Sequence, residues 1–351
     1  MKDFSLEITI LDVKMRINAL ARLGGFLLHH DEGLQQLTTS APQQNSWFTA
    51  KNTAQAIHAI GVMLNQSDLE KWLAPYNQLK TENAKAPKTI GLVLAGNIPM
   101  VGFHDILCVL ASGNKALIKL SSQDQKLIPY ILNKLIDIEP LFKGRFEFTD
   151  RLTGFDAVIA TGSGNTSRYF EYYFKNVPHI IRKNRNSIAV LTGNETTAEL
   201  KALGHDIFDY FGLGCRNISK VYVPENYDFR IFFEAIEEFQ PISDHHKYNN
   251  NYDYNKSIFL VNRDKHLDNG FLLVKKDERI ASPLAVLYYE EYTGFAQLQQ
   301  GLEPLKEQVQ CLVSHTNLNV DLAKVGFGQS QQPKLWDYAD RVDTLAFLSI
   351  L

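Results

Sequence analysis

A cysteine, Cys215, stands in a segment whose residue types suit nucleophilic catalysis. Residues 211–219 read Phe-Gly-Leu-Gly-Cys-Arg-Asn-Ile-Ser. Gly212 and Gly214 allow backbone turns that are closed to other residues, and the cationic Arg216 favours the thiolate, which is the nucleophilic form of the side chain. A small buried cysteine before a strand is the alternative, because free cysteines are mostly packing residues. The upstream sequence bears on which interpretation holds.

Polar and small residues follow several apolar runs upstream of this cysteine. Asn97 lies between a glycine and an Ile-Pro pair, where its amide could donate to a developing oxyanion, although a turn asparagine looks the same. Lys119 could contact a phosphate as a point charge, or it could end a strand in solvent. Residues 161–165, Thr-Gly-Ser-Gly-Asn, could present N–H groups to a phosphate, but this is not the dinucleotide fingerprint and also fits an ordinary loop.

From Thr89 onward, short apolar runs alternate with amphipathic stretches, as in a parallel sheet covered by helices on both faces. Ligands bind such doubly wound sheets at the carboxyl ends of the strands, so we expect the segments after each strand to matter most. The predicted strands are 89–95, 116–120, 156–160, 188–191 and 220–224. The predicted helices are 100–112, 124–138, 166–175 and 196–210.

The first 80 residues show helical periodicity and little that could carry chemistry. Apolar residues recur at helical spacing from Ile10 to Leu20 and again from Ala54 to Leu64. Ser67 followed by Glu70 fits a capping box that opens a short helix. The polar stretch at residues 79–87 is typical of a connection into the next unit.

Composition excludes several classes of protein. At 351 residues the chain is long enough for two domains, and 45% hydrophobic with 21% charged residues is typical of a globular protein. A net charge of -3 argues against nucleic-acid binding, which needs a basic face. Three widely spaced cysteines fit no disulfide framework or zinc site, and the pair His245-His246 lacks further ligands, so no metal is expected. With no signal-like start and no apolar run of membrane-spanning length, we expect a reducing cytoplasm and no membrane span.

Several further residues have simpler interpretations. Cys108 and Cys311 lie in apolar stretches and are predicted to pack in the core. His104 could face the same cavity as Asn97, but a core or helix-end histidine is the favoured prediction. Residues 243–255, rich in Asn and Tyr, are predicted to cross the surface, although they could form part of a substrate-entry lip. The aromatic residues at 169–174 could line an acyl tunnel, but packing of their helix is the simpler expectation.

Four of these segments, in this order, resemble the aldehyde dehydrogenase superfamily and, more closely, its acyl-CoA reductase branch, the LuxC family that supplies fatty aldehyde in bacterial bioluminescence. Residues 90–99 are similar to the strand that carries the superfamily's oxyanion asparagine, and residues 116–122 to its cofactor lysine strand. Residues 160–163 are similar to the Phe-Thr-Gly-Ser loop, and residues 212–223 to the catalytic cysteine segment. Weaker similarity continues through residues 279–284 to the end.

The resemblance implies an α/β fold of the aldehyde dehydrogenase type, with two parallel-sheet domains and an N-terminal helical segment. The implied divisions are a helical segment at 1–85, a cofactor-binding domain at 86–183, a catalytic domain at 184–325 and a C-terminal tail at 326–351. Cys215 would attack an acyl or carbonyl carbon, while the Asn97 side chain and the Cys215 N–H hold the oxyanion. The nucleotide would be contacted by Lys119, Ser121, Ser122, Gly162 and Ser163.

The chain departs from the family pattern at three places. Ile181 occupies the place of the glutamate that activates water in hydrolytic aldehyde dehydrogenases, and without that base an acyl-enzyme can exchange with coenzyme A or accept hydride. Ser122 stands where NAD-selective members often carry a ribose-binding glutamate, so repulsion against a 2′-phosphate is removed and NADPH becomes acceptable. Arg279 lies near the place of another ribose-binding glutamate, so that contact is not carried over.

Three basic residues follow Ile181 closely. Arg182, Lys183 and Arg185 either hold a phosphate of one ligand or form an exposed basic loop. The apolar tail that ends the chain could dock on another element or on another subunit of a homo-oligomer.

Together these features predict an oxidoreductase that reduces a fatty acyl group, carried by coenzyme A or by an acyl carrier, to the aldehyde through a Cys215 thioester. NADPH is the expected cofactor, with NADH as the alternative. A cysteine acyltransferase or thioesterase without hydride transfer is the main rival function, but it needs a base near Cys215 and none is evident. An aldehyde-oxidising dehydrogenase is a closer rival, and Ile181 counts against it.

Overall fold

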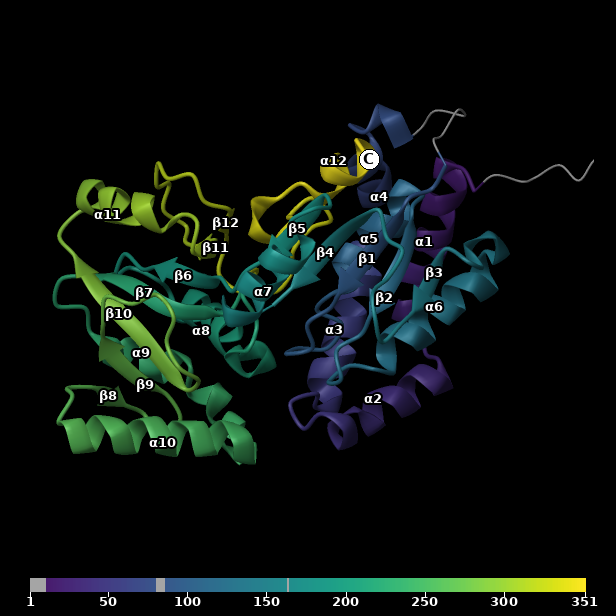
Figure 1. Ribbon diagram of the computed structural model, residues 1–351. Coiled ribbons are helices and arrows are strands. Elements are labelled where there is room, and N and C mark those ends of the chain that lie inside the picture. The colour runs from purple at the N-terminus through teal and green to yellow at the C-terminus, as the bar shows by residue number, and fades with distance from the viewer. Residues whose placement is uncertain (1–10, 80–85, 163) are drawn as a thin grey trace, which may run out of the picture. The chain divides into compact units, whose positions relative to one another are not determined.

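The computed structural model describes residues 11–79, 86–162 and 164–351 (Figure 1). Over this part of the chain the backbone forms two compact units, each built on its own mainly parallel sheet. Unit 1 contains the described residues up to Lys183 together with Lys334–Tyr338 and Val342–Leu351. Unit 2 contains Asn184–Pro333 and Ala339–Arg341. The predicted α/β class with parallel sheets is confirmed.

The sheet of unit 1 has five parallel strands in the order β3-β2-β1-β4-β5. Residues 90–92 of the central strand are all buried, because both faces of the strand are covered. The chain passes from β1 to β2 and β3 on one side and then to β4 and β5 on the other, which is the predicted doubly wound pattern. Strands β3 and β5 were not predicted, since one is very short and the other runs into basic residues. The bounds are β1 (Thr89–Val93), β2 (Lys115–Lys119), β3 (Phe146–Phe148), β4 (Ala157–Thr161) and β5 (His179–Arg182).

The predicted helical character of the N-terminal segment is confirmed, but one helix start differs. The Asn65 side chain accepts a hydrogen bond from the Asp68 N–H at 2.9 Å, so Asn65 caps α4 and the capping box predicted at Ser67 is wrong. The helices of unit 1 are α1 (Val13–Leu28), α2 (Glu32–Gln44), α3 (Ala50–Met63), α4 (Gln66–Leu73), α5 (Phe103–Ser112), α6 (Leu127–Ile138), α7 (Gly164–Phe174) and α12 (Thr344–Ser349), with 3₁₀ turns η1 (Asn77–Leu79) and η2 (Pro140–Phe142).

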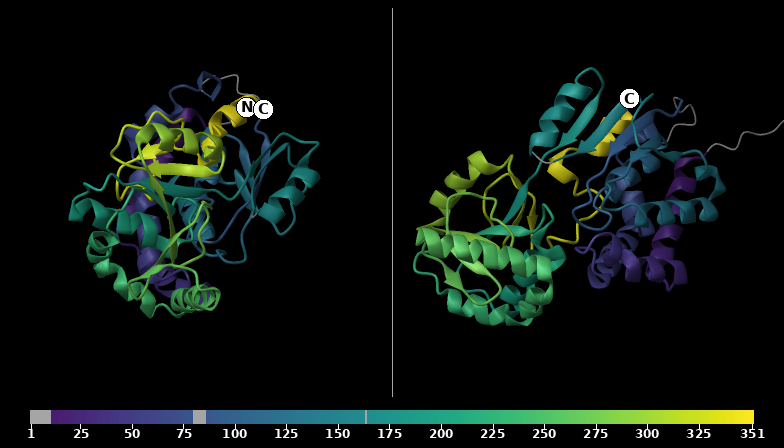
Figure 2. Two further views of the ribbon diagram at one scale, coloured as in Figure 1. Left: turned by 90° about the vertical axis from the view of Figure 1, so that its left-hand side faces the viewer. Right: turned by 60° about the horizontal axis from the view of Figure 1, so that its bottom comes forward.

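The C-terminal residues return to unit 1 and pack into its core. Helix α12 lies against α5, and Leu345 and Leu348 are buried in the same apolar cluster as the central strand. Tyr338 accepts a hydrogen bond from the Trp72 indole at 2.8 Å. Figure 1 and Figure 2 show the yellow helix α12 beside the blue elements of unit 1. The apolar tail therefore docks on other elements of its own chain.

Unit 2 is built on a seven-stranded sheet in the order β12-β11-β6-β7-β10-β9-β8. The strands are parallel except for β8, which pairs with β9 in the antiparallel sense. Residues 188–190 and 221–223 of the inner strands are buried, as expected for a sheet with both faces covered. The bounds are β6 (Asn186–Val190), β7 (Ile218–Pro224), β8 (Leu267–Asp268), β9 (Leu273–Lys276), β10 (Val286–Tyr292), β11 (Val309–Val313) and β12 (Lys324–Val325).

A helix replaces the surface crossing predicted at residues 243–255. Its buried residues Tyr248, Tyr252, Asn255 and Phe259 recur at helical spacing, but they are aromatic and amide residues, so an aliphatic pattern did not reveal them. The helices of unit 2 are α8 (Thr197–Phe208), α9 (Phe229–Ala235), α10 (His246–Asn262) and α11 (Phe295–Leu302), with 3₁₀ turns η3 (Asp209–Gly212), η4 (Glu237–Asp244), η5 (Glu303–Leu305) and η6 (Ala339–Arg341). Within the described part of the chain, no helix is both long and apolar enough to cross a membrane.

Candidate functional site

Three loops that the sequence singles out leave the unit 1 sheet at the same edge. Strand β1 lies between β2 and β4, and parallel pairing sets Val93 opposite Lys119. The segments after these three strands therefore gather at the carboxyl edge of the sheet, where doubly wound sheets bind ligands. They carry the predicted residues Asn97, Lys119, Ser121, Ser122 and Gly162.

The loops after β1 and β2 approach each other at Gly96. A Cβ atom on Gly96 would lie 2.4 Å from Ser121 Oγ and 3.0 Å from Gln123 Cβ. Any larger residue would clash with the side chains of Ser121 and Gln123 and push the two loops apart, so this packing requires glycine. Ser121 Oγ also accepts a hydrogen bond from the Gln123 N–H at 3.2 Å, which holds the second loop in its turn.

The predicted cofactor and oxyanion residues differ in exposure. Asn97, Lys119 and Ser122 are exposed, whereas Ser121 and Gly162 are half-buried. Ser163 lies outside the described residues. An exposed ammonium and hydroxyl groups at the carboxyl edge of a parallel sheet can meet the phosphate and ribose oxygens of a nucleotide, so the described residues fit such a ligand.

Asp124 was not among the predicted site residues, yet it ties the same two loops together. Its Oδ2 accepts a hydrogen bond from the Met100 N–H at 2.7 Å, and Met100 has a left-handed φ of +58°. Only 4% of Asp124 is exposed to solvent. This burial raises the pKa of the Asp124 carboxyl to about 6. Asp124 thereby anchors the turn that follows Asn97. The position of an acidic residue just before a helix is the feature of the sequence that could have indicated such an anchor.

Cys215 lies in unit 2, between η3 and the amino end of β7, and is partly buried. The backbone before it is unusual, because Tyr210, Phe211 and Gly212 have consecutive positive φ values of 54°, 60° and 77°. Such conformations are costly for residues other than glycine and cluster at functional sites. Gly212 thus has the predicted turn conformation. Gly214 does not have a positive φ, and the aromatic pair before Gly212 takes that conformation instead.

Asn217 holds the turn around Cys215. Its Oδ1 accepts a hydrogen bond from the Gly214 N–H at 2.8 Å, and its own N–H donates to the Gly214 carbonyl at 3.0 Å. Its Nδ2 donates to the carbonyls of Asp206 and Asp209 at 3.1 and 2.9 Å. The side chain is buried, so each of these bonds replaces one that water would otherwise supply. One asparagine therefore joins the end of α8 to the cysteine turn.

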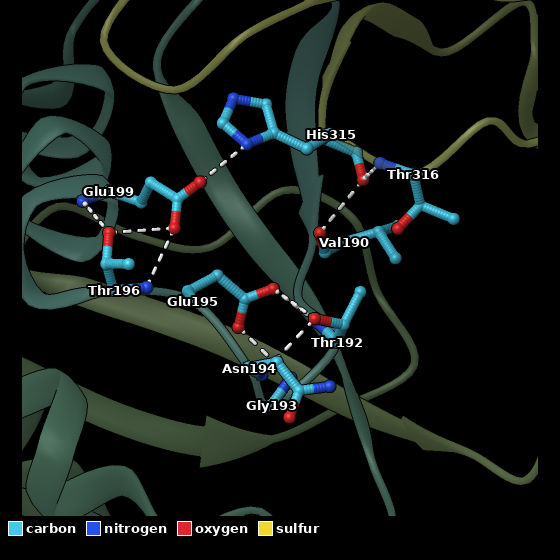
Figure 3. A network of polar contacts seen from close by, with 10 residues as sticks. Val190, Thr192, Gly193, Asn194, Glu195, Thr196, Glu199, His315 and Thr316 are labelled. Carbon is cyan, nitrogen blue, oxygen red and sulfur yellow. Dashed lines mark hydrogen bonds and ion pairs between the residues drawn. The ribbon is translucent and has the colours of Figure 1, made fainter.

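Helix α8 is fixed at its amino end by a network of polar contacts (Figure 3). Thr196 and Glu199 form a capping box, in which the Thr196 N–H donates to Glu199 Oε2 at 2.7 Å. His315, after β11, lies with Nδ1 2.7 Å from Glu199 Oε1. Glu195 closes the preceding loop by accepting a hydrogen bond from the Thr192 N–H at 2.6 Å. Hydrogen bonds from Thr196, foremost from its backbone N–H, lower the pKa of Glu199, which keeps the cap anionic.

The carboxyl end of α8 is fixed by a buried acid. Asp206 accepts hydrogen bonds from the backbone N–H groups of Gly328 at 2.7 Å and Ser330 at 2.9 Å. Burial nevertheless raises the pKa of Asp206. With both ends held, α8 leads the chain at a defined position into the turn that carries Cys215.

Comparison with models of protein families finds a match for the middle of the chain. A family model described as acyl-CoA reductase (LuxC) matches residues 63–236, a range that contains both Asn97 and Cys215. The chain belongs to this family. Membership and fold support an oxidoreductase that acts on acyl or aldehyde groups and uses a nicotinamide cofactor. A comparison with curated proteins finds no significant match.

Solved structures that resemble this LuxC family member are aldehyde dehydrogenases. Aldehyde dehydrogenase 21 from Physcomitrella patens, solved with the reaction product succinate, matches with a TM-score of 0.65 at 12% identity over 96% of this chain and 84% of its own. KauB from Pseudomonas aeruginosa matches with a TM-score of 0.60 at 14% identity over 88% and 73%. An NAD⁺ complex of the Bacillus cereus enzyme matches with a TM-score of 0.61 at 12% identity over 86% and 71%. At such identities the likeness establishes the fold.

In this LuxC family member the basic residues after Ile181 do not form a common phosphate site. Arg182 is buried in β5 and donates to Asp105 at 2.6 Å, while Lys183 lies 2.7 Å from Glu171 on the surface. Arg185, in unit 2, lies 3.2 Å from Asp340. Each cation already has an anionic partner. The alternative of an exposed basic loop also fails for Arg182, because β5 and its buried ion pair take its place.

Other predicted residues have structural roles. Cys108 and Cys311 are fully buried, as predicted, and burial raises the pKa of both thiols. His104 Nε2 lies 2.9 Å from the Leu335 carbonyl in the core of unit 1. Arg279 pairs with Asp277 at 2.6 Å. Of the aromatic residues on α7, Phe170 and Phe174 contact each other. Three tyrosines are 66–73% exposed, namely Tyr169, Tyr172 and Tyr173. Packing of the helix therefore explains only part of this aromatic run.

Proposed function

We propose that the protein is an NADPH-dependent acyl-CoA reductase that converts a long-chain acyl-CoA to a fatty aldehyde through a thioester on Cys215. The observation that carries the proposal is the strained, tightly held turn in which a partly buried cysteine follows three positive-φ residues. Membership in the acyl-CoA reductase family supplies the class of substrate. Three free thiols are consistent with a reducing, cytoplasmic setting.

The nucleophilic step needs only groups of this chain. The Cys215 thiolate attacks the acyl carbonyl carbon, a carbon–sulfur bond forms, and coenzyme A leaves as the thiolate. The neighbouring cation Arg216 favours the thiolate form of Cys215. The side-chain amide of Asn97 and the Cys215 N–H donate hydrogen bonds to the oxyanion, which is stabilised more than the ground-state carbonyl.

The cofactor is proposed to bind at the carboxyl edge of the unit 1 sheet. Lys119 and Ser122 are exposed there, and Ser121, Gly162 and Ser163 belong to the same proposed set. NADPH, when bound, would supply the hydride that reduces the acyl carbon. The carbon–sulfur bond to Cys215 then breaks, which releases the aldehyde and restores the cysteine thiolate. Neutral Ser122 leaves room for the 2′-phosphate without charge repulsion.

The residue at 181 determines what happens to the acyl-enzyme. Ile181 is a half-buried aliphatic residue of β5, paired with Ala160 in the sheet, and cannot take a proton from water. Hydrolysis is therefore slow, so the thioester persists until it is reduced or returns its acyl group to coenzyme A. This favours a reductase over an aldehyde-oxidising dehydrogenase.

The test follows NADPH oxidation with a long-chain acyl-CoA in the presence of an aldehyde trap. We expect trapped aldehyde from the wild type, none from Cys215→Ala, and normal production from the matched control Cys108→Ala. Cleavage of acyl-CoA without NADPH consumption would instead identify an acyltransferase or thioesterase. Oxidation of added aldehyde to acid, without reduction of acyl-CoA, would identify an aldehyde dehydrogenase.

A further inference from the structure

The ladder of the unit 2 sheet is irregular on both sides of Ser187. Toward β7, Ser187 pairs with Ile218 but the next residue pairs with Lys220, so one residue of β7 is skipped. Toward β11, the register also shifts, between Val309 and Leu312. Bulges of this kind leave backbone groups without their regular partners and often lie next to active sites. Here both bulges meet at one serine.

The Ser187 hydroxyl takes the place of the missing ladder bonds. Its Oγ accepts a hydrogen bond from the Cys311 N–H at 3.2 Å and donates to the Cys215 carbonyl at 3.0 Å. The side chain is fully buried, so water does not compete for these groups. Ser187 Oγ also lies 3.1 Å from Cys311 Sγ. A side chain in β6 thus reaches the backbone of the candidate nucleophile 28 residues away.

The two peptide groups that flank the Cys215 Cα atom are both held. The Asn217 N–H donates to the Gly214 carbonyl at 3.0 Å, which fixes the peptide plane that contains the Cys215 N–H. Ser187 donates to the Cys215 carbonyl, which fixes the peptide plane that follows. Because φ and ψ describe the rotation of these two planes about Cα, fixing both planes sets the direction of the Cys215 Cα–Cβ bond, from which the thiol projects.

We propose that Ser187 is a positioning residue that orients the Cys215 thiol and the Cys215 N–H for acyl transfer. The proposal rests on the proposed function only in taking Cys215 as the nucleophile. Ser187 itself does not touch the substrate. Loss of its hydroxyl removes one hydrogen bond from the buried Cys311 N–H and one from the partly buried Cys215 carbonyl, and the turn then relaxes away from the geometry that catalysis needs.

The first test measures the alkylation of Cys215 by iodoacetamide as a function of pH in the cofactor-free protein, read by peptide mass. We expect Ser187→Ala to lower the rate at least about fivefold at neutral pH and to shift the pH midpoint, because the turn that sets the surroundings of the thiol relaxes. The matched control is Ser112→Ala, since Ser112 is also buried but belongs to unit 1 and donates to the Val109 carbonyl at 2.8 Å. Equal profiles for the two variants would overturn the proposal.

A second pair separates the hydroxyl from the volume of the side chain. Ser187→Thr and Ser187→Val add the same bulk, and both are β-branched residues suited to a strand, but only threonine keeps the hydroxyl. We expect the threonine variant to retain the wild-type pH profile better than the valine variant. If Ser187→Ala opens buried Cys311, which lies next to the Ser187 hydroxyl, to the reagent, this pair decides, and identical behaviour of the two variants refutes the role of the hydroxyl.

The same variants distinguish the two proposals from each other. In acyl-CoA reduction, Ser187→Ala is expected to lower kcat at least about tenfold with less than about a twofold change in KM, as for an interaction realised in the transition state. If neither the wild type nor any variant reduces acyl-CoA, the proposed function fails. The alkylation profiles still report whether Ser187 positions Cys215.

Discussion

Asp105 accepts hydrogen bonds from Arg182 in a buried ion pair, with Asp105 Oδ1 2.6 Å from Arg182 Nη2. Arg182 also donates to Thr344 Oγ1 at 2.8 Å. The pair therefore joins β5, α5 and the returning C-terminal helix α12 within unit 1. This arrangement makes Arg182 a structural residue and removes it from the set of cations that could bind a ligand phosphate.

Arg182→Ala is expected to lower the free energy of unfolding by about 3–5 kcal/mol, because it leaves the Asp105 carboxylate buried without its partner. Lys183→Ala serves as the control, since Lys183 pairs with Glu171 at the surface and should cost less than about 1 kcal/mol. Denaturant titration measures both values. A variant of normal stability that has lost affinity for the cofactor would show that Arg182 binds a ligand after all.

Asn217→Ala is expected to destabilise the protein by about 2–4 kcal/mol and to abolish acyl transfer, because several buried backbone groups lose their only described side-chain partner. The comparison is Asn250→Ala, at an exposed position of α10, which should change stability by less than about 0.5 kcal/mol. Thermal unfolding and the alkylation rate of Cys215 provide the two readouts. Unchanged alkylation in a folded Asn217→Ala protein would contradict the role assigned to this residue.

Asp124 gives a pH dependence whose sign follows from its raised pKa. The pKa of the Asp124 carboxyl is about 6 in the folded protein and 3.8 in the unfolded chain, so the folded state binds the proton more tightly. The contribution of this group to stability is therefore present below about pH 4 and is lost as the pH rises through about 6. Asp124→Asn keeps an acceptor for the Met100 N–H and removes the buried charge. We expect it to raise the free energy of unfolding at pH 8 by about 1–3 kcal/mol and to have little effect at pH 4.5.

Asp150→Asn is the matched control for this measurement, since Asp150 is exposed and its neutralisation should leave both values within about 0.5 kcal/mol. Urea titrations at the two pH values supply the comparison. A loss of stability in Asp124→Asn at pH 8 would mean that the hydrogen bonds from the Met100 and Leu127 N–H groups, which favour the anion, outweigh the cost of burying the charge.

Ser122→Glu is expected to shift cofactor preference from NADPH toward NADH. A carboxylate beside the 2′-phosphate introduces like-charge repulsion, which at the protein surface amounts to about 1–4 kcal/mol, or at least about fivefold in the ratio of kcat/KM values. Ser122→Gln adds the same bulk without charge and should retain the original ratio. Equal ratios for Glu and Gln would show that residue 122 does not face the 2′-position.

Much of the fold follows from local sequence patterns. The apolar runs that predicted β1, β2, β4, β6 and β7 correspond to strands within two residues at each end, because a strand buried on both faces must be apolar throughout. Strand β5 was missed because an edge strand tolerates the charged residues that follow Ile181. Helix α10 was missed because its buried face is made of tyrosine and asparagine.

The sequence by itself determined the parallel α/β class, the family, and the candidate residues Asn97, Lys119 and Cys215, since each depends on short runs of neighbouring residues. Only the tertiary structure decided that Ser187 and Asn217 hold the cysteine turn, that Asp124 anchors the turn after Asn97, and that Arg182 is neutralised by Asp105, 77 residues away. The reason is physical. Strand order and register bring distant side chains within hydrogen-bonding distance, and no local periodicity specifies which strands become neighbours.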